Sequence, residues 1–238
     1  MPLEGDQKPI IMVSSAVYGW EDLLEQIFSY LETFGYEVYM SHMGTVPLGP
    51  RENQFDACIR AVETCDIFLS ILLPRYGSGK ESPDEPSITH RELMRAVELE
   101  KPRYSLVHHH IPIARKVLTD YGYGPAERRK TLTLTRPDRT SLLDDLRLID
   151  MYDLAAALRD ADDVKIPAQQ RVDGWVQEFR TDREAIRFVT TQLANVDKIR
   201  TFLIEEKLRK EAEAAKAAEA IQTVEIEADG PNKAVKDD

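Results

Sequence analysis

The chain has 238 residues, of which 42% are hydrophobic and 31% charged, and its formal net charge is −11. A hydrophobic fraction of this size predicts one folded soluble domain with extensions, and the aromatic content of 8% excludes a fully disordered chain. The acidic balance argues against nonspecific binding of nucleic acid, because affinity for phosphate comes from clustered Lys and Arg.

Apolar runs in this sequence are too short to cross a membrane, which takes about 18 apolar residues. The N-terminal stretch MPLEGDQK lacks the basic and then apolar layout of a secretory signal. We therefore expect a cytoplasmic protein that does not contact a membrane. Cys58 and Cys65 fit no metal-ligand spacing, and we expect them to be reduced thiols.

Short apolar segments alternate with amphipathic ones over the first 110 residues. The strands are expected at residues 10–13, 36–40, 67–73 and 104–107, and the helices at about 20–34, 50–65 and 89–100. Residues 67–73 are the most apolar of these segments, which is typical of the central strand of a parallel sheet. The pattern predicts an α/β fold with three layers, a doubly wound parallel sheet with helices on both faces.

The second half of the chain is less regular. We expect residues 1–8 to be a tail, residues 9–180 to form the α/β domain, and residues from about 120 to 140 to be an insertion loop within it. Thr181 to Glu184 has the form of a capping box and predicts a long helix over residues 181–222, which would project into solvent or bind a partner. Residues 223–238 are expected to be disordered.

Candidate binding residues follow the first predicted strand. Ligands of open α/β sheets bind beyond the carboxyl ends of the strands. Ser14 and Ser15, with Tyr18 just before the next helix, can present hydroxyl groups and backbone amides to a phosphate or a ribose. The sequence has neither a dinucleotide fingerprint nor a phosphate-binding P-loop. The alternative is that Ser15 or one of its neighbours only caps the helix.

Glu92 is the candidate catalytic residue, because it is expected in the first turn of the helix that follows the central strand. A carboxylate that faces the cleft could bind a ribose diol and stabilise an oxocarbenium-like transition state while an N-glycosidic bond breaks. The alternative is structural. Residues Thr89 to Glu92 also form a capping-box sequence, in which Glu92 would bond only to the Thr89 amide.

Two further features of the sequence have a functional and an ordinary reading. Arg75 could bind phosphates and Tyr76 could stack on a base, although an Arg-Tyr-Gly turn is also normal loop composition. His108, His109 and His110 are adjacent, and on an extended segment their side chains would point to alternate faces. We therefore expect no metal site and no required cofactor.

The segments described so far resemble a bacterial domain of unknown function, number 4062, in their order and spacing. They are residues 11–15, 34–38, 65–69, 74–77 and 87–92. That family is similar to the Toll/interleukin-receptor (TIR) and nucleoside deoxyribosyltransferase group of flavodoxin-like domains. The resemblance covers residues 9–110 well, and residues 142–147 and 175–179 more loosely.

The resemblance implies a flavodoxin-like fold and a role for one residue. In the enzymatic relatives a glutamate after the central strand assists cleavage of a ribose C–N bond, and Glu92 is in the matching position. The implied function is cleavage of an N-glycosidic bond in NAD⁺ or another nucleotide, in bacterial defence or stress signalling.

Two alternatives to net hydrolysis stay open, a module without catalysis and an enzyme that transfers deoxyribose. The chain could be a noncatalytic signalling or assembly module, which binds a nucleotide or a partner protein and forms a homo-oligomer through its C-terminal helix. Transfer of deoxyribose between bases is the other, and it would show base exchange in place of hydrolysis.

Overall fold

The structure is a computed structural model, and it describes residues 7–79, 82, 85–132, 142–157 and 175–228. The chain divides into two units. One consists of residues 7–196, and the other of residues 1–6 and 197–238.

The first unit is built on a parallel sheet of five strands in the order β2-β1-β3-β4-β5. The strands are β1 (Ile10–Ser15), β2 (Glu37–Tyr39), β3 (Ile67–Leu72), β4 (Arg103–His108) and β5 (Val176–Phe179). All six residues of β3 are buried, and β3 is the central strand, as its apolar sequence predicted. β5 was missed, because its four residues, Val-Gln-Glu-Phe, mix polar and apolar side chains.

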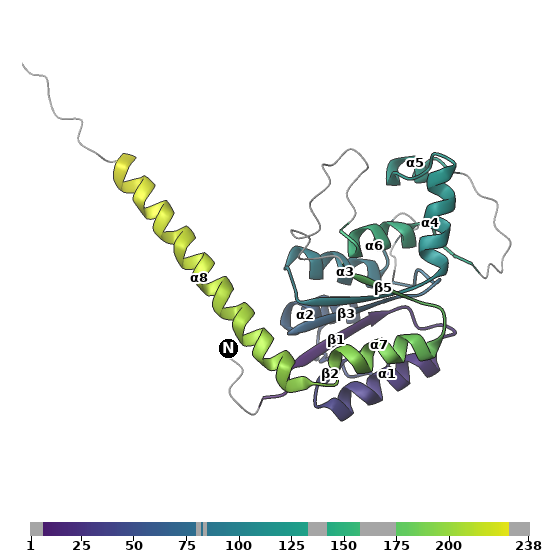
Figure 1. Cartoon of the computed structure of the whole chain (residues 1–238), viewed down its shortest axis with the longest axis horizontal. Coiled ribbons are helices and arrows are strands. Elements are labelled where there is room, and N and C mark those ends of the chain that lie inside the picture. Colours follow the sequence, from purple (N-terminus) through teal and green to yellow (C-terminus); the bar gives the residue numbers. More distant parts are fainter. Residues whose placement is uncertain (1–6, 80–81, 83–84, 133–141, 158–174, 229–238) are drawn as a thin grey trace, which may run out of the picture. The chain divides into compact units, whose positions relative to one another are not determined.

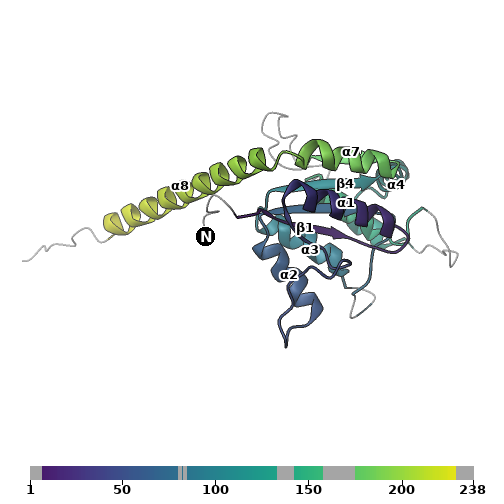
Figure 2. The same cartoon turned by 90° about the horizontal axis from the view of Figure 1, so that it is seen from below.

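Helices cover both faces of the sheet, which confirms the doubly wound α/β fold (Figure 1). Figure 2 shows α1 and α7 on one face and α2 and α3 on the other. The helices of this unit are α1 (Glu21–Phe34), α2 (Gln54–Thr64), α3 (Ile88–Glu98), α4 (His110–Asp120), α5 (Ala126–Lys130), α6 (Arg147–Ala155) and α7 (Asp182–Leu193).

Each face of the sheet is covered through the apolar stripe of its helices. α1 buries Leu23, Leu24, Ile27 and Leu31 at helical spacing. It ends at Gly35, whose φ of 102° is in the left-handed region that favours glycine. α3 buries Leu93 and Ala96 in the core on the other face, where α2, α4 and α6 also contribute.

The amino edge of the sheet is held by Asp66, which lies directly before β3. Its carboxylate accepts a hydrogen bond of 2.7 Å from the backbone N–H of Ile10, the first residue of β1. Asp66 is therefore a structural residue at the edge opposite to the carboxyl ends of the strands.

The second half of the chain corrects two expectations. α5 occupies part of the predicted insertion loop, and residues 133–141 lie outside the described residues. The helix predicted over residues 181–222 is two helices, α7 and α8 (Val196–Ala228), because the chain leaves the helical conformation at Asn195. α8 continues beyond the predicted end at residue 222, and residues 1–6 and 229–238 are not described.

The start of α7 is at the predicted capping box. The Thr181 hydroxyl accepts a hydrogen bond from the backbone N–H of Glu184.

Among the helices of the described residues, none is both long and apolar enough to cross a membrane.

Candidate functional site

A pocket of about 420 Å³ opens at the carboxyl edge of the sheet, where β1 and β3 end. β1 is followed in the chain by β2 on one side of it, whereas β3 and β4 lie on its other side. The pocket is therefore at the point where the order of the strands in the sheet changes direction. This is where open α/β sheets bind ligands. The pocket is lined by Ser15, Ala16, Val17, Tyr18, Ser41, Arg75, Gly77, Ser78, Ile88, Thr89, Glu92 and Asp144.

Glu92 is the buried acidic group of this pocket. Its side chain comes from α3, and the residue is only 4% exposed. The Ser14 hydroxyl donates a hydrogen bond of 2.5 Å to Glu92 Oε2, and the Cys58 thiol also hydrogen-bonds the carboxylate. The carboxylate therefore connects α3 with β1 and α2.

Burial is the main influence on the acidity of this group. Removal from water raises the pKa of Glu92 to about 7, against the lowering effect of the bonds from Ser14 and Cys58. Burial and the Glu92 charge raise the pKa of the Cys58 thiol to about 12, so this thiol stays protonated and acts as a donor. Near neutral pH Glu92 can therefore both accept and release a proton, as a general acid or base must.

The capping alternative for Glu92 is wrong. α3 begins at Ile88, and its cap is Ser87, whose hydroxyl accepts a hydrogen bond of 3.3 Å from the His90 N–H. The sequence predicted Glu92 in the first turn of the helix, but it is in the second turn. Its carboxylate bonds β1 and α2 instead of the Thr89 amide.

The capping alternative for Ser15 is also wrong. α1 has Trp20 at its cap position and no side-chain capping bond, whereas the Ser15 hydroxyl donates to the carbonyl of Ile71 at 3.0 Å. Ser15 therefore joins the ends of β1 and β3, and it lines the pocket. Tyr18, which is 80% exposed, is at the pocket as well.

The loop after β3 places its two candidate residues differently. Arg75 lines the pocket, but Tyr76 does not, because its ring is buried in the core. The Tyr76 hydroxyl is 2.7 Å from His90 Nδ1, and the guanidinium of Arg147 lies 4.4 Å from the centre of the ring. The structure thus assigns Tyr76 to the support of the loop and not to the lining of the pocket.

Several pocket residues were not predicted from the sequence. Asp144 accepts a hydrogen bond of 2.8 Å from the Tyr76 N–H, a contact between segments that are distant in the sequence. Gly77 adopts a φ of 84°, and a Cβ there would be 3.4 Å from Thr89 Oγ1. A loop glycine that needs a positive φ was the one signal available in the sequence, since nothing about Asp144 distinguishes it from other surface acids.

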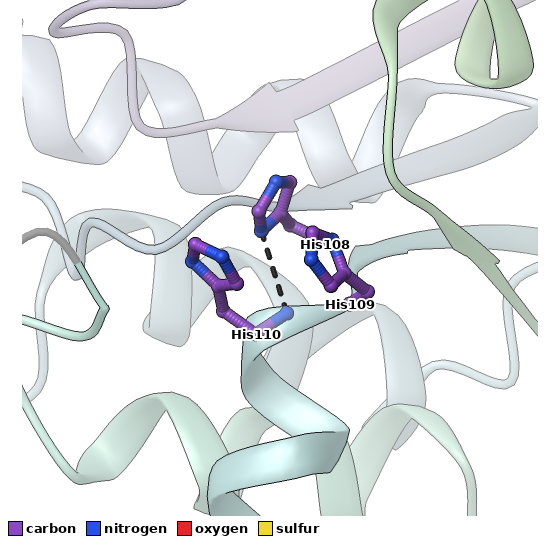
Figure 3. A group of neighbouring side chains, drawn as sticks. All are labelled: His108, His109 and His110. Carbon is purple, nitrogen blue, oxygen red and sulfur yellow. Dashed lines mark hydrogen bonds between the residues drawn. The ribbon is translucent and has the colours of Figure 1, made fainter.

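The three adjacent histidines are arranged differently from the prediction. His108 ends β4 and His110 begins α4, and His109 between them has φ and ψ of −56° and −19°. The segment is therefore a tight turn and not extended. Its three imidazole rings come together, with ring centres 4.4 to 4.5 Å apart (Figure 3).

The comparisons with known proteins give a family and no activity. No curated protein matches the chain. A protein-family model described as a domain of unknown function (DUF4062) matches residues 10–141, a region that contains β1 to β4 and most of the pocket. Since this match covers more than half of the 238 residues, the chain belongs to the DUF4062 family.

Proposed function

We propose that the chain is a TIR-like enzyme that cleaves the N-glycosidic bond of NAD⁺ or another nucleotide, with Glu92 as the catalytic residue. The observation that carries this proposal is a buried carboxylate, with a pKa of about 7, in the wall of the pocket at the strand reversal. Strongly shifted carboxyl groups in a cleft are typical of functional sites, because burying such a group destabilises the fold. We propose that this activity serves bacterial defence or stress signalling.

The lining of the pocket suits a nucleotide. Its volume of about 420 Å³ is in the range of small-molecule sites. Arg75 would bind a phosphate, Ser15 would bond the ribose or a phosphate, and the exposed ring of Tyr18 would stack on the base. Ser14 takes a different role from the one expected, because its hydroxyl is used to hold Glu92.

The reaction follows from the charge that develops on the sugar. The bond between ribose C1′ and the base nitrogen breaks, and the electron pair leaves with the base. Positive charge then spreads over C1′ and the ring oxygen, and the ionised Glu92 stabilises it or bonds the ribose hydroxyls. Water adds to C1′, and its proton passes to Glu92 or to solvent.

Incubation of the purified protein with NAD⁺ and a panel of nucleosides and nucleotides tests this proposal, with chromatography of the products. Glu92→Gln should lower turnover by a factor of about 10² or more, as the loss of an acid–base or electrostatic group does. Glu98→Gln is the matched control, because Glu98 is at the end of the same helix with its side chain 68% exposed. Release of nicotinamide or a free base that Glu92→Gln abolishes and Glu98→Gln retains would support the enzyme.

One observation favours a second function, a noncatalytic signalling or assembly module that binds a nucleotide or a partner protein. The Glu92 carboxylate already accepts bonds from Ser14 and Cys58, so it is also a well-satisfied structural group. Binding of NAD⁺ without any product from the folded wild-type protein would favour this function.

The module would assemble through its C-terminal helix. α8 exposes the apolar side chains of Phe202, Ile204 and Leu208, which could pair with a second copy or a partner. The oligomeric state of the full chain, compared with that of a chain ending at Asn195, would show whether α8 mediates assembly.

A further inference from the structure

Three imidazole side chains converge at the carboxyl end of β4, outside the residues that line the pocket. Each of His108, His109 and His110 offers one ring nitrogen, and these three atoms all lie within 4.8 Å of one another. Figure 3 shows the three rings gathered around the turn from β4 into α4. The arrangement results from the helical backbone conformation of His109. In an extended segment the three side chains would point to alternate faces, whereas here the chain turns and the rings come together.

Two ring nitrogens of this cluster have no hydrogen-bond partner in the described part of the chain. They are Nδ1 of His109 and Nδ1 of His110, and both are buried. Buried ring nitrogens without a partner are costly, because they lose their bonds to water and gain none in return. Two such atoms in adjacent residues need an explanation, and a bound ligand supplies one.

The contacts of the His110 and His108 rings fit a ligand set. The His110 imidazole hydrogen-bonds the Leu142 backbone, and since its Nδ1 has no partner, that bond falls to Nε2. A histidine ligand normally donates its second ring N–H to a carbonyl in this way. His108 Nδ1 accepts a long bond of 3.4 Å from the His110 N–H, which a metal ion bound to that nitrogen would replace.

Aromatic side chains restrict the position of the His108 ring. Trp20 packs against it edge to face with the ring centres 5.1 Å apart, and Phe179 does the same at 5.5 Å. This packing holds the His108 ring beside those of His109 and His110, whose centres are 4.5 and 4.4 Å away.

We infer that His108, His109 and His110 bind one divalent transition-metal ion of the zinc class. Three imidazole ligands suit Zn²⁺, Ni²⁺ or Cu²⁺ and not Mg²⁺ or Ca²⁺, which prefer oxygen ligands. Tetrahedral Zn–N bonds of about 2.0–2.1 Å put ligand atoms roughly 3.3 Å apart, so modest rotations of the rings close the cluster around the ion. Three protein ligands leave a fourth position for water or an anion.

Metal binding by the full chain tests this inference, after treatment with EDTA and dialysis. Titration with Zn²⁺ against a competing chelator should give one ion per chain. Co²⁺ in place of Zn²⁺ should give the intense visible absorption of a four-coordinate site. Loss of a residue that only hydrogen-bonds a metal ligand lowers metal affinity by about 10-fold to 100-fold. His109→Ala and His110→Ala should each lower the Zn²⁺ affinity by more than this.

The chain offers a matched control in His42, an exposed histidine after β2. His42→Ala should leave the affinity and the Co²⁺ spectrum unchanged. The circular dichroism of the variants shows that they are folded, and His109 and His110 are chosen over the more buried His108 for that reason. Wild-type protein that binds Zn²⁺ no more tightly than the double variant His109→Ala/His110→Ala would overturn the inference, and so would an octahedral Co²⁺ spectrum in the wild type.

Discussion

The burial of Glu92 makes the stability of the fold depend on pH. The folded-state pKa of about 7 is above the value of 4.5 for an exposed glutamate. Between these two values the unfolded chain has released the proton and the folded chain still holds it. The contribution of this residue to stability is therefore present below pH 4.5 and is lost as the pH rises through 7.

Glu92→Gln removes this titration, so the variant should gain stability relative to the wild type as the pH rises from 4.5 to 8. A shift of this size corresponds to at most about 3 kcal/mol in the free energy of unfolding. Urea unfolding of both proteins at the two pH values, in EDTA, measures the difference. A difference that is the same at both pH values would contradict the assigned pKa.

The hydrogen bond from Ser14 should matter most when Glu92 is ionised. Ser14→Ala removes a donor that lowers the Glu92 pKa, so that pKa should rise further, which carbon NMR of the carboxyl group can follow. The variant should lose about 1–3 kcal/mol of stability at pH 8 and less at pH 5.

Ser70→Ala is the control for Ser14→Ala. Ser70 is opposite Ser14 on β3 and equally buried, and its hydroxyl has no hydrogen-bond partner in the described residues. An unchanged Glu92 titration in Ser14→Ala, or an equal change in Ser70→Ala, would show that the contact between Ser14 and Glu92 is not what sets this pKa.

Among the elements, α3 depends on its cap. Ser87→Ala removes the acceptor for the His90 N–H and should lower the free energy of unfolding by about 1 kcal/mol, whereas Ser87→Gly should cost only a few tenths. Thermal unfolding of both variants checks this. Equal losses in the two variants would mean that the serine acts through its packing and not as a cap.

The two C-terminal helices should differ in what they contribute. α7 buries Phe188, Val189 and Leu193, and the Leu193 carbonyl accepts a bond of 3.0 Å from the buried Tyr36 hydroxyl. A chain ending at Asn195 should therefore keep the cooperative thermal transition of the first unit, and a chain ending at Thr181 should lose it. Circular dichroism during heating measures both, and a folded protein ending at Thr181 would contradict the role given to α7.

For the whole molecule, the sequence predicted what regular patterns encode. The continuous apolar run of β3 and the helical spacing of Leu23, Leu24 and Ile27 gave the central strand and a covering helix. β5 could not be predicted in this way, because its pairing with β4 depends on contacts between distant segments. The break between α7 and α8 was missed because Asn195 interrupts a segment that otherwise favours a helix.

The candidate site was predicted in part for the same reason. The rule that ligands bind at the carboxyl ends of strands led to Ser15, Arg75 and Glu92, all of which line the pocket. Side-chain direction is a tertiary property, so the burial of Tyr76 and the bond from Ser14 to Glu92 could not be read from the sequence. The turn at His109 is a local feature, but its backbone conformation has no clear sequence signal.

Turnover of NAD⁺ by the wild type, Glu92→Gln and Glu98→Gln at equal concentration tests whether Glu92 is a catalytic residue. The wild type and Glu98→Gln should release nicotinamide, and Glu92→Gln should lose about 10²-fold or more of this activity. Full activity in a folded Glu92→Gln protein would contradict the role of Glu92. The absence of product from NAD⁺ and from the whole nucleotide panel with folded wild-type protein would contradict the proposed enzyme.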